Sequence, residues 1–253
     1  MLRPPKDAAH LREMALLSEP VKGQVRQAVF RAAEAGARAS ARYHRARLTG
    51  DAHLPREGAA LLVGNHGLWG YETPAFFSLV HAATGRYPVG LAEHGFFRIP
   101  LVRTVLPWLG GVKGTRDNAH AALSEGRLVV CYPGGAHETF KPPHRHYMLR
   151  WERSLGFARL AAEAQVPVVP FAGFGVDDTF VYPGGGRLGV QLAPEEKYRM
   201  PVVMPLPLPV RLSFAVGEPL APPPSGARTE ALAQFRDRVA ARVRGLLAEA
   251  FHA

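Results

Sequence analysis

The chain has 253 residues, of which 47% are hydrophobic, and this is sufficient for the core of a single α/β domain. The 31 lysine and arginine residues against 21 aspartate and glutamate residues give a formal net charge of +10, so we expect the surface to attract anions: phospholipid headgroups, a phosphate-bearing cofactor or nucleic acid. The single cysteine, Cys131, excludes an intramolecular disulfide framework and is typical of a reducing compartment.

Targeting signals are not expected. The sequence lacks the run of about eighteen apolar residues that a membrane-spanning helix needs. Residues 1–17 contain acidic side chains and no long apolar stretch, so they do not have the pattern of a secretory signal peptide. An arginine-rich proteome would itself produce much of the positive charge, so composition does not choose between the anionic partners.

A long basic helix is predicted near the start of the chain, from Ser18 to Arg42. Its apolar positions, Val21, Val25, Val29 and Ala32, recur at helical spacing. Such a helix can lie on an anionic bilayer or pack against its own domain, and a stripe of valine and alanine favours packing. Residues 43–50 alternate weakly and predict an edge strand. We therefore divide the chain into an N-terminal arm and amphipathic helix, 1–42, and a main domain, 43–253.

The most informative stretch follows the apolar run Leu61–Gly64, which predicts a strand. His66 lies just beyond the carboxyl end of this strand, which is where open α/β sheets bind their ligands, and Glu72 comes six residues later. Thr73 is predicted to cap a helix whose first residue is Pro74. A carboxylate that folds back to one nitrogen of the His66 ring would fix its tautomer and leave the other nitrogen free to take a proton.

Two further segments have alternative interpretations. The apolar residues on either side of Pro100 would line a pocket for hydrocarbon or belong to the core, and the core is the default. Arg116, with Lys113 nearby, precedes a predicted helix over 117–124 and forms either an anion site or an ordinary solvated basic loop. His144 and His146 lack the neighbouring ligands and the spacing of known zinc sites, so we predict no metal site.

The remaining elements complete an α/β pattern without an internal repeat or a dividing linker. A buried strand over 127–132 runs into the tight turn Pro133-Gly134-Gly135, with Glu138 just beyond it. The other predicted elements are helices over 74–84 (closed by Gly85), 101–109, 151–164 and 229–251, strands over 88–92, 167–172 and 211–216, and a proline-rich break over 201–209.

Four blocks in this order, VGNHGLWGYETP, GGVKGTRDN, VVCYPGGAHE and VPVVPFAGFGVDD, resemble the glycerolipid (PlsC-like) acyltransferase superfamily, and its diacylglycerol-acyltransferase/phytyl ester synthase-like branch in particular. The likeness runs from about Tyr43 to Phe180 and includes HGFFRIPLVR and WERSLGFARLA. It implies a PlsC-like fold: one α/β domain with a mixed, mostly parallel central sheet flanked by helices. The loops of His66 and Arg116 are expected to meet at one end of the sheet beside an apolar channel.

The resemblance also implies an activity, the transfer of a fatty acyl group from acyl-CoA or acyl carrier protein to the hydroxyl of a lipid alcohol. His66 would be the general base and Glu72 would hold its imidazole. No metal or tightly held cofactor is implied, and the expected location is cytoplasmic, peripheral on the inner face of an anionic membrane. Backbone N–H groups near Gly67 or Gly135 are candidates for holding the oxyanion. The residues expected to bind substrates are Asn65, Gly67, Lys113, Arg116, Gly134, Gly135 and Glu138.

Two departures from the superfamily pattern leave alternatives open. Much of the superfamily has Asp five residues after the His, where this chain has Tyr71, with Glu72 one position later. His137 stands where the family often has Arg, which favours a neutral acceptor over a phosphorylated one. A lipid-binding, membrane-associated protein without turnover on the same fold is therefore the second hypothesis. A thioesterase or lipase is third because the Gly-x-Ser-x-Gly elbow is absent, and nucleic-acid binding is last.

Overall fold

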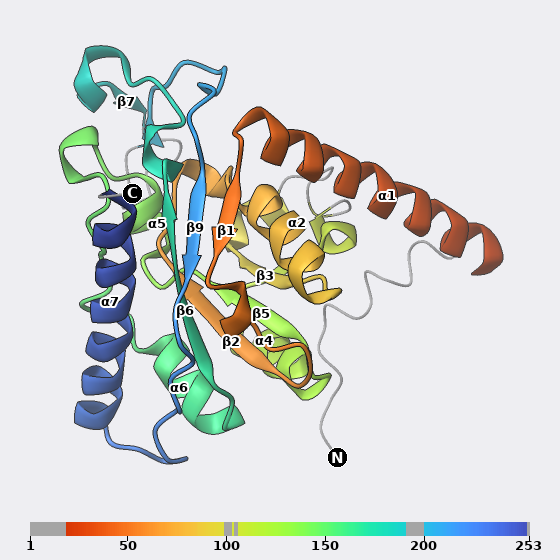
Figure 1. Cartoon of the computed structure of the whole chain (residues 1–253), viewed down its shortest axis with the longest axis vertical. Coiled ribbons are helices and arrows are strands. Elements are labelled where there is room, and N and C mark those ends of the chain that lie inside the picture. Colours follow the sequence, from red (N-terminus) through yellow and green to blue (C-terminus); the bar gives the residue numbers. More distant parts are fainter. Residues whose placement is uncertain (1–18, 99–102, 104–105, 191–199, 252–253) are drawn as a thin grey trace.

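The computed structural model describes residues 19–98, 103, 106–190 and 200–251 (Figure 1). The α-helices are α1 (Glu19–Tyr43), α2 (Thr73–Thr84), α4 (Arg116–Ser124), α5 (Gly135–Thr139), α6 (Gly156–Ala164) and α7 (Thr229–Phe251). The strands are β1 (Arg47–Thr49), β2 (Ala60–Gly64), β3 (Val89–Ala92), β4 (Gly111–Lys113), β5 (Leu128–Cys131), β6 (Val168–Phe174), β7 (Gly189–Val190), β8 (Met200–Pro201) and β9 (Ser213–Val216). Short 3₁₀ helices cover 51–53, 68–70, 94–98, 106–109, 143–145, 176–178 and 183–186.

One sheet organises the domain, with seven strands in the order β1-β9-β6-β2-β5-β3-β4. Every neighbouring pair is parallel except β6 with β9, which are antiparallel. The predicted mixed, mostly parallel sheet is thus confirmed, and the predicted edge strand is β1. Because β2, β3, β4, β5 and β6 run the same way, the loops that follow them emerge at one edge of the sheet.

Helices cover both faces of this sheet, because its central strands are apolar on both sides. Alternate residues of β2 show the two layers: Leu61 and Val63 pack with α4, α6 and α7, whereas Ala60 and Leu62 pack with α2. Figure 1 shows α7 and α2 on opposite sides of the sheet. The β2 strand is completely buried, so the loop that follows it starts from the buried centre of the domain.

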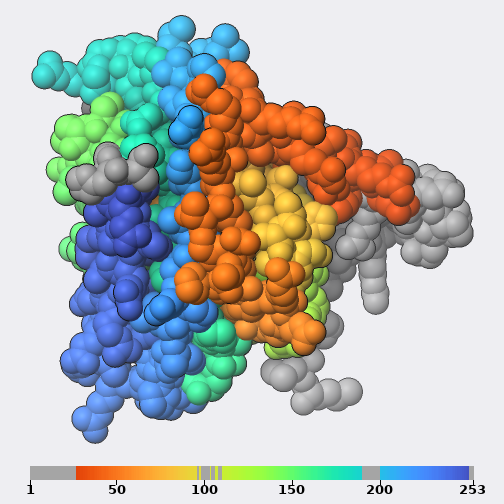
Figure 2. Space-filling view, in the orientation of Figure 1, coloured from red at the N-terminus to blue at the C-terminus, as the bar shows by residue number. Residues whose placement is uncertain are grey.

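The long helix α1 packs against α2 and extends beyond it, away from the sheet (Figure 1). The space-filling view shows α1 and β1 on the surface beside α2 (Figure 2). Helix α1 confirms the element predicted over 18–42, but its inward face differs from the predicted stripe: Ala32 is exposed and Ala37 is buried. The side chains of Val21 and Val25 lie outside the described part. A hydrogen bond between Nδ1 of His81 and Oε1 of Glu34, 3.1 Å long, joins the two helices.

Several predicted boundaries are corrected by the structure. Glu72, and not Thr73, occupies the N-cap position of α2, so the helix begins one residue earlier than predicted. Helix α6 begins at Gly156 and not at Trp151, whose indole is buried before the helix starts. Residues 106–109 form a 3₁₀ helix, and most of the apolar segment around Pro100 lies outside the described residues. No helix in the described part of the chain is long and apolar enough to span a bilayer.

Candidate active site

The loop after β2 begins with a buried side chain that ties it to β6. Asn65 is 1% exposed, its amide nitrogen donates to the Gly173 carbonyl at 2.8 Å, and its oxygen accepts from the Gly173 N–H at 2.7 Å. Both ends of the Asn65 amide are therefore occupied by the backbone of the neighbouring strand. The structure places this predicted substrate-binding residue in a supporting position, where it fixes the start of the His66 loop.

The expected pairing of His66 with Glu72 is present. The Nδ1 atom of His66 lies 3.0 Å from Oε1 of Glu72, and the same oxygen accepts from the Gly67 N–H at 3.2 Å. The Glu72 side chain is 2% exposed and the His66 side chain 15%. An ionised carboxylate can only accept, so Nδ1 carries the proton and donates, while Nε2 is left as the basic nitrogen.

The loop between these two residues is tightly folded. Trp69 has φ 54°, a left-handed conformation that is rare for a bulky residue, and Gly70 follows with φ 68°. A side chain at Gly70 would meet the His66 ring 2.8 Å from its Cβ, and one at Gly67 would meet the Val176 carbonyl oxygen at 2.5 Å. This conformation folds the chain back within six residues, so that Glu72 reaches the His66 ring.

Tyr132, at the end of β5, covers the imidazole. Its ring stacks on His66 with centroids 4.1 Å apart and an angle of 15° between the planes. Its hydroxyl lies 3.0 Å from the Oγ1 atom of Thr73. Burial raises the pKa of the Tyr132 hydroxyl well above its usual value, and the nearby Glu72 carboxylate raises it further, so this group stays protonated. Contacts on the edge and on the face of the His66 ring thus fix its orientation.

Glu138 holds the backbone of the His66 loop. Its Oε1 accepts from the His66 N–H at 2.9 Å, and its Oε2 accepts from the Trp151 indole at 2.8 Å and from the Arg150 N–H at 3.3 Å. The residue is 1% exposed, and burial raises its pKa, against the opposing effects of Lys141 and these donors. Gly134 allows this approach, because its Cβ would lie 2.1 Å from Oε2. Both Glu138 oxygens accept hydrogen bonds from the chain itself, so Glu138 supports the His66 loop from the buried side.

A buried ion pair that the sequence did not predict completes this support. The ammonium of Lys141 donates to the His66 carbonyl at 3.0 Å and pairs with Asp177 at 2.8 Å, both side chains being at most 4% exposed. Burial raises the pKa of Asp177, and Lys141 acts against this rise. From the sequence, no role was assigned to Lys141. Its partner lies 36 positions later, and no local pattern connects the two.

The other predicted substrate-binding positions lie in different surroundings. The N–H of Gly67 bonds to Glu72 and that of Gly135 to the Tyr132 carbonyl at 3.1 Å, so the N–H groups of these two glycines, near which an oxyanion site was expected, are themselves occupied. Arg116 begins α4, where its exposed guanidinium pairs with Glu163 at 2.6 Å. Within the described residues no hydrogen bond or ion pair joins Arg116 or Lys113 to His66, although Lys113 ends the parallel strand β4 and Arg116 follows it at the same edge of the sheet.

Known proteins match a large part of this chain. A family model described as Acyltransferase matches residues 45–173, about half of the chain, from β1 to β6. A bovine protein named "DGAT1/2-independent enzyme synthesizing storage lipids" is 29% identical over 79% of this chain and 60% of its own length. Its human counterpart is 28% identical over 83% of this chain and 67% of its own length. "Phytyl ester synthase 2, chloroplastic" of Arabidopsis thaliana is 31% identical over 49% of this chain and 19% of its own length.

A solved structure supports the same fold. The 1-acyl-sn-glycerophosphate acyltransferase PlsC of Thermotoga maritima superposes with a TM-score of 0.56 at 19% identity, covering 96% of this chain and 87% of the other. At this level of identity the match shows the architecture and not the substrate. The chain spans about three fifths of the length of the bovine relative, so the activity of that whole protein is not transferred to it.

Proposed function

The chain belongs to the acyltransferase family, and on this basis we propose that it transfers a fatty acyl group from an acyl thioester to the hydroxyl of a lipid alcohol. The observation that carries the proposal is the His66–Glu72 contact at 3.0 Å, at the end of a completely buried central strand. This pair supplies a base with a fixed tautomer, which is the group that activation of an alcohol needs.

In the proposed reaction, Nε2 of His66 takes the proton of the acceptor hydroxyl. The acceptor oxygen attacks the carbonyl carbon of the thioester, and a new C–O bond forms. Collapse of the tetrahedral intermediate breaks the C–S bond, and the departing thiolate takes back the proton from Nε2. No covalent enzyme intermediate is required, which agrees with the absence of a Gly-x-Ser-x-Gly elbow from the sequence.

Glu72 has an electrostatic role in this mechanism. When His66 holds the proton, its imidazolium is stabilised by a carboxylate 3.0 Å away in surroundings from which water is largely excluded. The longer spacing of this chain, with Tyr71 at the usual carboxylate position, does not separate the two groups. The contact supports the proposal against a lipid-binding protein without turnover, for which the unusual spacing was one of two reasons.

The surroundings of the site favour a neutral lipid alcohol over a phosphorylated acceptor. The guanidinium of Arg116 already has an anionic partner, Glu163. The third block of the sequence has His137 where a bidentate arginine would clamp a phosphate. Because acceptor and product are lipids in this proposal, we place the protein at the cytoplasmic surface of a membrane, with acyl-CoA or acyl carrier protein as donor and no resident cofactor.

The test is release of free thiol from acyl-CoAs of several chain lengths, measured with and without mono- or diacylglycerol or long-chain alcohols, followed by detection of the ester product. We expect His66→Ala to abolish alcohol-dependent release while the protein stays folded. His81→Ala is the matched control, because His81 also places Nδ1 against a glutamate, 3.1 Å from Glu34, but between α1 and α2. The control should keep its activity.

The outcomes separate the competing hypotheses. Activity retained in His66→Ala would refute the assignment of the base. Thiol release without ester formation would indicate a thioesterase. Binding of lipid with no thiol release from acyl-CoA or acyl carrier protein would favour the lipid-binding protein without turnover.

A further inference from the structure

The exposed large apolar side chains of the described residues are gathered in one region. Six of the nine lie in two segments, 181–188 and 202–208, which flank the paired strands β7 and β8 and bond to each other. Two more lie close to them: Tyr43, at the end of α1, bonds to Pro207 in the second segment, and Trp69, from the His66 loop, packs on Phe180 directly before the first. We call these eight residues the apolar rim: Tyr43, Trp69, Val181, Leu188, Val202, Met204, Leu206 and Leu208. Isolated exposed apolar residues are ordinary, but a contiguous group on one edge marks an interaction surface.

Backbone hydrogen bonds hold the segments of the rim together. The N–H of Val202 donates to the Leu188 carbonyl at 3.0 Å, and that of Met204 donates to the Val181 carbonyl at 2.9 Å. The Tyr43 hydroxyl donates to the Pro207 carbonyl at 2.7 Å and so attaches the end of α1. Figure 2 shows these parts meeting at one edge of the molecule, cyan, blue and orange in turn. Leu206 is 77% exposed at this edge.

The rim is continuous with the catalytic loop. Trp69, from the strained turn between His66 and Glu72, packs edge-to-face on Phe180 with centroids 5.8 Å apart. Residue 180 directly precedes the rim segment 181–188, and Leu208 donates its N–H to the carbonyl of the adjacent Thr179 at 2.7 Å. A surface that receives the rim would therefore also contact the loop that holds the proposed base.

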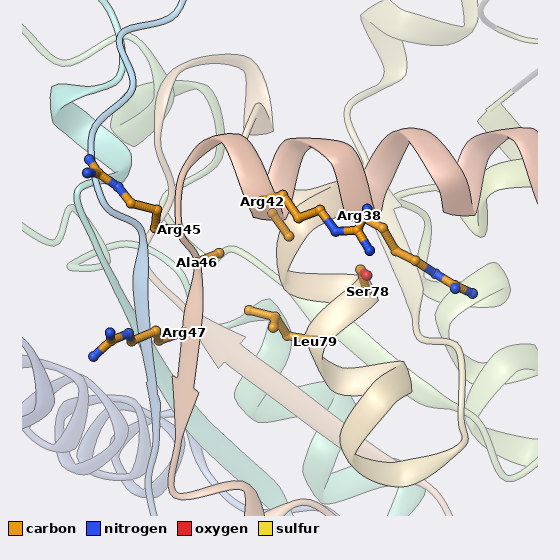
Figure 3. Close-up of a pocket in the computed structure, with 8 residues that line it drawn as sticks. Arg38, Arg42, Arg45, Ala46, Arg47, Ser78 and Leu79 are labelled. Atoms are coloured by element: carbon orange, nitrogen blue, oxygen red, sulfur yellow. The ribbon is translucent and has the colours of Figure 1, made fainter.

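Arginines lie beside the rim. Arg38, Arg42, Arg45 and Arg47, together with Leu79 of α2, line an open hollow of about 470 Å³ at the junction of α1, β1 and α2. Figure 3 shows Arg38 and Arg42 extending to one side of Ala46, and Arg45 and Arg47 to the other. Among the described residues, Arg42 and Arg47 have no ion-pair or hydrogen-bond partner for their side chains. The charge is thus spread over a surface and does not converge on one point.

We propose that the apolar rim and these arginines dock the protein on an anionic lipid bilayer, with the catalytic loop turned toward the lipid. The proposal rests on the proposed function, because it explains how a lipid alcohol would reach His66. Apolar side chains next to tyrosine, tryptophan and arginine have the composition that the interface of a bilayer favours. A two-dimensional array of headgroups matches spread arginines better than a single phosphate does.

The test is co-sedimentation with phosphatidylcholine vesicles, with and without phosphatidylglycerol. We expect binding to the anionic vesicles, weakened roughly tenfold in Met204→Ser/Leu206→Ser. In Arg42→Gln/Arg47→Gln it should weaken roughly thirtyfold at low salt, and added salt should reduce this difference. Met148→Ser, a 53% exposed residue outside the rim, and Arg228→Gln/Arg242→Gln, exposed arginines before and on α7, are the matched controls and should bind like the wild type.

Several results would overturn the proposal. Equal binding by the rim variant and Met148→Ser, or equal binding to neutral and anionic vesicles, contradicts it. If the rim variant instead converts a dimer to a monomer in light scattering without changing vesicle binding, the rim is an interface between copies of the chain.

The catalytically inactive His66→Ala variant should bind vesicles like the wild type. This separates the two proposals: a protein that binds vesicles but transfers no acyl group keeps the docking surface and loses the proposed function. A protein that transfers acyl groups without binding vesicles would keep the proposed function and refute the docking surface.

Discussion

Replacing Lys141 with methionine tests whether buried charges hold the proposed base in place. Methionine keeps most of the volume of the side chain and removes its ammonium group. Two contacts are lost, the ion pair with Asp177 at 2.8 Å and the hydrogen bond to the His66 carbonyl at 3.0 Å. Both the lysine and the aspartate side chains are at most 4% exposed, so water does not readily replace the missing partner.

The expected loss of stability is about 4 kcal/mol. Breaking a buried ion pair by removing one partner costs about 3–5 kcal/mol. Asp177 keeps the N–H of Tyr147 on its second oxygen at 2.6 Å, which favours the lower end of that range. The unpaired carbonyl of His66 adds roughly 1 kcal/mol. Because a domain is stable by only about 5–15 kcal/mol, the loss is readily measured, and the protein should still fold at low temperature.

This loss depends on pH in a direction that the pKa shift fixes. Burial raises the pKa of Asp177 above its ordinary value of 3.8, and Lys141 limits the rise, so removing the lysine raises this pKa further. An acid whose pKa is higher in the folded state stabilises the fold fully below its unfolded pKa and loses that stability as pH rises through the folded pKa. The difference between the variant and the wild type should thus be smallest near pH 4 and grow toward neutral pH.

Urea unfolding at several pH values, followed by tryptophan fluorescence, measures this difference, since Trp151 is buried beside Glu138. Asp177→Asn in the Lys141→Met background should recover part of the stability at neutral pH and little at pH 4. Arg116→Met, which breaks an exposed ion pair, is the matched control and should lose far less. A loss below about 1 kcal/mol, or one that is the same at every pH, would refute the reasoning.

Three further predictions concern the neighbourhood of the base. Glu72→Gln should lower kcat about 10²- to 10⁴-fold in the thiol-release assay, and unchanged kcat would contradict the role of Glu72. The same variant should keep its urea midpoint, because one oxygen of Glu72 is buried without a hydrogen-bond partner. Gly67→Ala should destabilise the protein by about 1–3 kcal/mol, since the new Cβ would lie 2.5 Å from the Val176 carbonyl oxygen, and a calorimetric Tm equal to that of the wild type would exclude this clash. Burial raises the pKa of the Cys131 thiol to about 12, so it should react with a disulfide reagent at pH 8 only slowly when folded and rapidly in urea; equal rates would show an accessible thiolate.

The sequence was sufficient to predict elements whose signals are local. The apolar run of β2 and its abrupt end before His66 predicted both the strand and the position of His66 just beyond it. Helix α7 was predicted at its observed bounds, Thr229–Phe251, because its apolar residues recur at helical spacing over its whole length. The Glu72 side chain was within reach because the glycine-containing loop is short, and so its contact with His66 needed no information from distant residues.

The contacts that sequence reasoning did not predict join distant segments of the chain. Glu138 was expected to bind substrate, but its oxygens are taken by donors 72 positions before it and 12 and 13 positions after it. Trp151 was predicted to open a helix, whereas its indole is used as one of those donors. The Asn65 amide bonds to the backbone of Gly173, which lies next to it only because β2 and β6 are neighbouring strands. A single sequence carries the residue types for these contacts but not the pairing of strands that brings them together.

The buried charges around His66 also have a consequence for the proposed reaction. The carboxylates of Glu138 and Asp177 are held near the backbone of this residue, with Lys141 as the intervening cation, and the carboxylate of Glu72 lies at its ring. When the imidazole takes a proton, it becomes a cation in surroundings with more acidic than basic side chains. A site whose charges are fixed before the substrate arrives needs little rearrangement to accept that cation, which is the condition under which electrostatic stabilisation is most effective. Burying these charged groups costs stability, and we attribute their presence to the stabilisation of His66 when it holds the proton.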